Sequence, residues 1–163
     1  MKFIFVVLLA LGTSSALPMK LGAEKDSECK GDRKLFETFY DLYKANSTFI
    51  DKAVAIFADV DLTSKQAMDA VADVYKKLPA AEQKLVDAFA CNYGVRIAAA
   101  ALTLVDEMDR FPDSDKKQVD GMLEFMKDDN KTGRQVIEKV HTVYGSISNN
   151  AKHVLDDLFA SIL

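Results

Sequence analysis

The chain has 163 residues, of which 25 are acidic and 21 are basic, giving a formal net charge of −4. This length indicates one globular unit, since domains commonly hold about 100–200 residues. The 49% of apolar and 28% of charged residues exclude an intrinsically disordered chain and a collagen-like repeat. The acidic balance argues against a protein that binds nucleic acid by neutralising phosphates.

The first 16 residues have the pattern of a secretory signal peptide. Lys2 precedes an unbroken apolar run over residues 3–11, and small side chains lead up to a cleavage site after Ala16. The run is too short for a membrane anchor, which needs about 20 apolar residues. We therefore predict a secreted, extracellular protein whose mature domain spans residues 17–163, with a net charge of −5 once Lys2 is removed.

If the protein is exported, its two cysteines are expected to have a structural role. Cys29 and Cys91 are expected to form a disulfide in an oxidising compartment, because neither adjoins a histidine or a basic cluster that would activate a thiol. Two sequons, at Asn46 and Asn130, are candidate glycosylation sites in the same compartment.

Helical spacing of apolar residues dominates the mature chain. A first helix is predicted over residues 32–45 and a second to about residue 59. Thr63 and Gln66 form the capping-box pattern of a third helix start.

A long helix is predicted over residues 79–110, about 48 Å at 1.5 Å per residue. Pro79 suits its first turn, and the only charge between Asp87 and Asp106 is Arg96. Because the segment is apolar on more than one face, we expect it to be buried at the centre of the fold. Its first apolar stripe holds Val86, Phe89, Tyr93, Ile97, Ala100, Leu104, Met108 and Phe111, and its second holds Leu85, Ala88, Cys91, Val95, Ala98, Leu102 and Val105.

Three further helices follow the long one. Ser114 is predicted to cap the first, residues 128–130 break the pattern, and Gly145 and Ser146 end the second. The last begins near Ser148. The whole is predicted to be a single all-α domain of six to seven amphipathic helices around the long helix.

No catalytic or metal-binding pattern in the sequence supports an enzyme, a cofactor or a metal site. His141 and His153 are the only histidines. Glu138 and His141 have the spacing seen in di-iron bundles, but such a site needs a second copy of the motif. Paired acidic residues near helix ends are explained by solvation.

Four consecutive alanines, residues 98–101, interrupt the larger side chains of the long helix. Small residues either let a neighbouring helix approach closely or leave an apolar cavity between helices. In the second case Arg96 and Tyr93 could bind a carboxylate head group. The candidate ligand-binding residues are Phe89, Tyr93, Arg96, Ile97, Ala100 and Leu104.

Two segments, residues 78–89 (LPAAEQKLVDAF) and 147–159 (ISNNAKHVLDDLF), resemble helices of the nematode fatty-acid and retinol-binding proteins. The signal peptide and the acidic, tryptophan-free helical chain are similar to that family too. The resemblance implies a helical fold around a cavity that carries fatty acids or retinol, without catalytic residues.

The first functional hypothesis is therefore a secreted carrier of a small hydrophobic ligand, a fatty acid or a retinoid, in an apolar cavity between helices. The alternative is a secreted helical interaction protein with a packed core that acts through its surface. A membrane-active bundle is disfavoured, because such helices carry a basic polar face.

Overall fold

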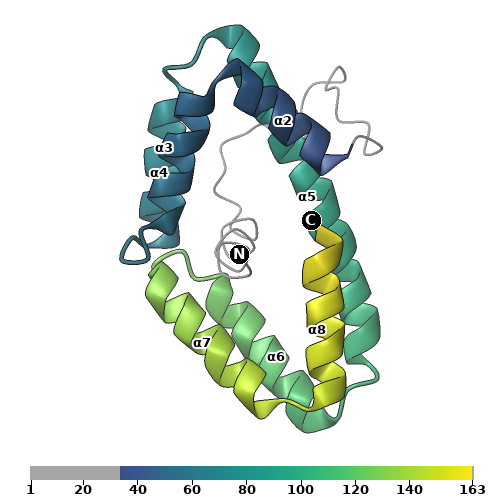
Figure 1. Ribbon diagram of the computed structural model, residues 1–163. Coiled ribbons are helices and arrows are strands. Elements are labelled where there is room, and N and C mark those ends of the chain that lie inside the picture. The colour runs from purple at the N-terminus through teal and green to yellow at the C-terminus, as the bar shows by residue number, and fades with distance from the viewer. Residues whose placement is uncertain (1–33, 163) are drawn as a thin grey trace.

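The computed structural model describes residues 34–162, and this part of the chain is helical with one isolated β-bridge and no strand (Figure 1). The all-α prediction is confirmed. The predicted signal peptide and Cys29 lie outside the described residues. The seven described helices are α2 (Leu35–Ala45), α3 (Ser47–Ala58), α4 (Ser64–Tyr75), α5 (Ala80–Met108), α6 (Asp113–Met126), α7 (Gly133–Ser146) and α8 (Asn149–Ile162).

The helices are arranged as an open ring in which each one packs mainly on its neighbours (Figure 1). α2 and α8 lie along the two halves of α5, α3 pairs with α4, and α6 pairs with α7. Within the described residues the buried apolar side chains form four separate clusters. The largest joins α6, α7 and α8 and contains the completely buried Val119 and Ala151.

Two helix starts share the same capping box. The Thr63 hydroxyl accepts a hydrogen bond from the Gln66 backbone, and the Gln66 side chain accepts one from the Thr63 backbone. Thr132 and Gln135 repeat both bonds at the start of α7. The first box was predicted. The predicted cap at Ser114 is wrong, because α6 begins one residue earlier at Asp113 after Pro112, without a side-chain cap.

The loops that carry these caps pair with each other through reciprocal hydrogen bonds. The backbone N–H of Ser64 donates to the Lys131 carbonyl, and that of Gly133 donates to the Leu62 carbonyl, both at 3.1 Å. This pairing holds the end of the α3–α4 pair against the α6–α7 pair. The contact joins the two helix pairs on the side of the ring opposite α5 (Figure 1).

The two matching capping boxes belong to an internal repeat in which equivalent residues are 69 positions apart. The same residue type occurs at positions 63 and 132, 66 and 135, 75 and 144, and 87 and 156. The Tyr75 hydroxyl donates to Asp87 at 2.9 Å, and the Tyr144 hydroxyl donates to Asp156 at 2.9 Å. The first unit comprises α2, α3, α4 and the first half of α5. The second comprises the other half of α5 with α6, α7 and α8, so the two units share the longest helix.

The expectation that this long helix is buried on most sides is wrong. In its most apolar stretch of 18 residues, 17% of the residues are buried. The reason is that α2 and α8 pack mainly on the first stripe, one on each half of the helix. The second stripe includes exposed side chains, of which Leu102 at 70% and Val105 at 63% are the most open.

Candidate functional site

The candidate ligand-binding residues of α5 lie mostly on its packing stripe. Ile97 and Ala100 are buried against Leu158 of α8, with Tyr93 and Leu104 packed at the edge of the same cluster. Side chains of the protein itself therefore cover this part of the stripe. The alternative of a packed core accounts for these four positions, and their role as ligand lining stays a prediction.

Phe89 belongs instead to a group of rings that joins α5 to α2. Its ring lies 5.8 Å from that of Phe39 and 6.1 Å from that of Tyr93, and Phe39 stacks on Tyr43 at 6.5 Å. Phe39 and Tyr43 are exposed. The group therefore runs from the surface of α2 to the middle of α5. The exposed rings of α2 were predicted as part of an amphipathic helix but not as an open patch.

The middle of α5 holds two buried polar atoms without a hydrogen-bond partner. They are Oδ1 of Asn92 and the hydroxyl of Tyr93. The Asn92 side chain is 3% exposed and its Nδ2 donates to the Ala88 carbonyl at 2.9 Å. Burial raises the pKa of the Tyr93 hydroxyl, because the ionised form would lose its solvation. Arg96, the predicted head-group partner, is half-buried on the next turn.

A pocket of about 310 Å³ lies between α3 and the end of α4, open to solvent. Phe49, Val74 and Leu78 supply apolar side chains, while Lys52 and Lys77 add two cations. Asn46 and Thr48, from the start of α3, complete the lining. Sequence reasoning did not find this pocket, because its residues come from two helices and a turn that are brought together by the fold.

The Asn46 side chain has a structural role beside this pocket. Its Oδ1 accepts a hydrogen bond from the Phe49 backbone and so caps α3. Its Nδ2 donates to Glu82 of α5 at 2.6 Å. The other sequon residue, Asn130, is exposed in the loop before α7, where its Nδ2 donates to Asp128. The geometry therefore leaves Asn130 far more accessible to modification than Asn46.

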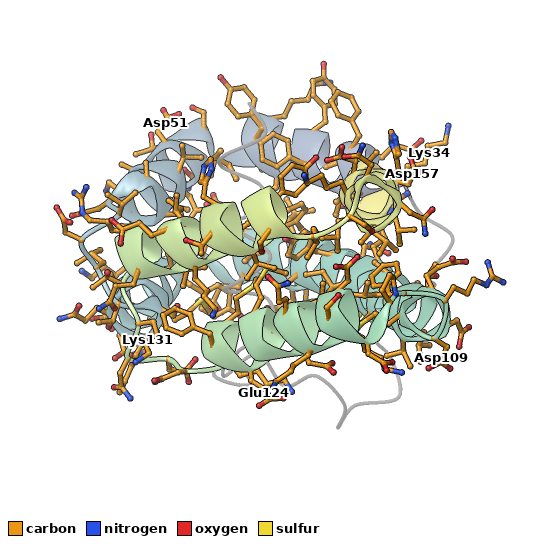
Figure 2. All side chains as sticks on the ribbon, turned by 90° about the horizontal axis from the view of Figure 1, so that it is seen from below. Lys34, Asp51, Asp109, Glu124, Lys131 and Asp157 are labelled. Carbon is orange, nitrogen blue, oxygen red and sulfur yellow. The ribbon has the colours of Figure 1, made fainter. Side chains whose placement is uncertain are left out.

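Charged side chains of the described residues are spread over the outside of the ring, as Figure 2 shows for Asp51, Asp109 and Glu124. Within the described residues no group of three or more His, Cys, Asp or Glu side chains could hold a metal ion. α5 is the one described helix that is long and apolar enough to cross a membrane by length and composition. A single such helix is weak evidence for a membrane span.

The candidate site thus has two parts, the pocket beside α3 and the partly exposed rings of α2 and α5. No family model matches the sequence, and comparisons with curated proteins and with solved structures found no significant match.

Proposed function

We propose that this protein is a secreted carrier that binds a small hydrophobic ligand, a fatty acid or a retinoid. The observation that supports the proposal is the pocket beside α3. Its volume of about 310 Å³ reaches the lower end of the range for ligand pockets, about 300–1,000 Å³. The apolar side chains of Phe49, Val74 and Leu78 would remove an alkyl chain from water, and each buried methylene contributes about 0.8 kcal/mol before the costs of ordering.

Titration of the delipidated mature protein with an environment-sensitive fluorescent fatty acid tests the proposal. We expect a saturable rise in emission that oleate reverses. Protein made without glycans avoids interference from either sequon. If the wild-type protein gives no saturable rise at micromolar concentration, the carrier function is refuted.

A matched pair of variants tests where the ligand binds. Thr48→Trp places a large ring at the pocket, on an exposed position of α3. Lys117→Trp is the control, because residue 117 is the equivalent exposed position of the second unit. We expect Thr48→Trp alone to weaken binding. If both variants bind the ligand with equal affinity, the ligand does not bind in this pocket. That result would not refute the carrier function.

A second candidate function is a secreted interaction protein that acts through its surface. The specific observation in its favour is the row of exposed rings on α2, of which Phe36 is 71% exposed and Tyr40 stacks on it at 6.2 Å. Aromatic side chains are enriched at the centres of protein interfaces. A Phe36→Ala variant that keeps full affinity for the fluorescent fatty acid but loses a protein partner would favour this second function.

A further inference from the structure

We propose that the pocket beside α3 selects an anionic amphiphile, a carboxylate or equivalent anion joined to an apolar tail, over its neutral counterpart. The tail would lie over Phe49, Val74 and Leu78, and the anion would lie between the ammonium groups of Lys52 and Lys77. This inference rests on the proposed carrier function and adds the charge of the ligand to it.

In the second unit of the repeat, the positions equivalent to two of the apolar pocket residues are buried. The residues equivalent to Val74 and Leu78 are Val143 and Ile147, and each of these is 4% exposed. The Ser146 hydroxyl, at the position of Lys77, donates to the side chain of Gln118, at the position of Phe49. These apolar positions are therefore buried in the second unit and partly exposed around a pocket in the first.

A backbone contact closes the second unit further. Asp115, at the position of Asn46, is buried, and its Oδ2 accepts a hydrogen bond from the Ser148 backbone at 3.1 Å. In the first unit the equivalent of Ser148 is Pro79, which has no N–H to donate. Asn46 bonds to Glu82 instead. The difference between the units thus follows from the residues present in each.

The charges of the two units differ at the same place. Lys52 and Lys77 occupy positions that hold Gly121 and Ser146 in the second unit. Among the described residues neither lysine forms an ion pair, whereas five other lysines do: Lys65, Lys76, Lys116, Lys127 and Lys131. Lys52 and Lys77 together with Glu82, which accepts a hydrogen bond from Asn46, sum to one positive charge on a chain that is acidic overall. A monoanionic ligand would balance that charge.

Calorimetric titration with decanoate and with decanol tests the selection, because the two ligands share a tail and differ in charge. We expect the wild-type protein to bind decanoate more tightly. The double variant K52Q/K77Q should bind decanoate about three- to tenfold more weakly, since rim charges contribute modestly, with decanol binding unchanged. Added salt should weaken decanoate binding alone. The control K117Q/K127Q removes the same charge from the second unit and should behave as the wild type.

Equal affinity of K52Q/K77Q and wild type for decanoate would overturn the inference, and so would an equal loss for both ligands. Either result leaves the carrier function standing if the fluorescent fatty acid still binds. The absence of any saturable binding by that probe would instead refute the carrier function itself. The two failures are therefore distinguishable.

Discussion

The unpartnered hydroxyl of Tyr93 offers a direct test of how the middle of α5 is packed. A buried hydroxyl without a partner costs about 1–3 kcal/mol. The substitution Tyr93→Phe removes that oxygen and retains the ring, which stacks on Phe89 with an interplanar angle of 11°. Because Tyr93 is half-buried, we expect a gain near the lower end, about 1 kcal/mol in the free energy of unfolding.

Urea unfolding followed by circular dichroism measures this change. With a typical dependence on urea of about 2 kcal/mol per molar, the midpoint should rise by about 0.5 M. The control Tyr43→Phe removes an exposed hydroxyl and should stay within about 0.5 kcal/mol of the wild type. A destabilised Tyr93→Phe protein would refute the reasoning, because it would show that the hydroxyl has a partner in solution. Weaker binding of the fluorescent fatty acid by this variant would favour a ligand site on α5.

Three further predictions follow from the caps, the tyrosines and the sequons. Thr63→Ala and Thr132→Ala should each lower the free energy of unfolding by about 1 kcal/mol, since both capping boxes make the same bonds; a clear inequality in urea midpoints would contradict their equivalence. Burial first, and then the hydrogen bond to a carboxylate, raise the pKa of Tyr75 to about 12. Its contribution to stability should be complete below pH about 10, where the unfolded tyrosine titrates, and should be lost as pH rises through about 12; Tyr75→Phe should flatten this decline in a pH series of unfolding curves. In a secreted preparation, the glycan-dependent mass shift should disappear in Asn130→Gln and persist in Asn46→Gln.

Local structure could be predicted from the sequence because its causes are local. The capping pattern at Thr63 correctly predicted a helix start, and the break in the apolar periodicity at residues 128–130 correctly predicted a loop. The first stripe of α5 was predicted as a continuous apolar face, and it is the face that α2 and α8 contact. Periodicity finds such a face because every member lies on one side of the same helix.

Tertiary features were missed because more than one element determines them. The second stripe of α5 is apolar like the first, and only the ring arrangement leaves Leu102 and Val105 exposed. The pocket is lined by Lys52 from α3 and Lys77 from the turn after α4, which only the fold brings to one site. One sequence pattern could have predicted more: the motif D-x-[DN]-x-T-x-x-Q, present at residues 59–66 and 128–135, marks the repeat and the second capping box.

The repeat also divides stability unequally between its two units. The second unit contributes the largest buried cluster and includes Val119, Val136 and Ala151, which are at most 1% exposed. The two clusters that α3 and α4 help to form are smaller, and one of them borders the open pocket. Segments with fewer buried contacts open at lower free energy. We therefore expect native-state hydrogen exchange to release the amides of α3 and α4 before those of α6 and α7, and decanoate to slow the first group selectively. Exchange of both pairs at one common free energy would show instead that the shared helix α5 and the paired loops make the ring a single cooperative unit.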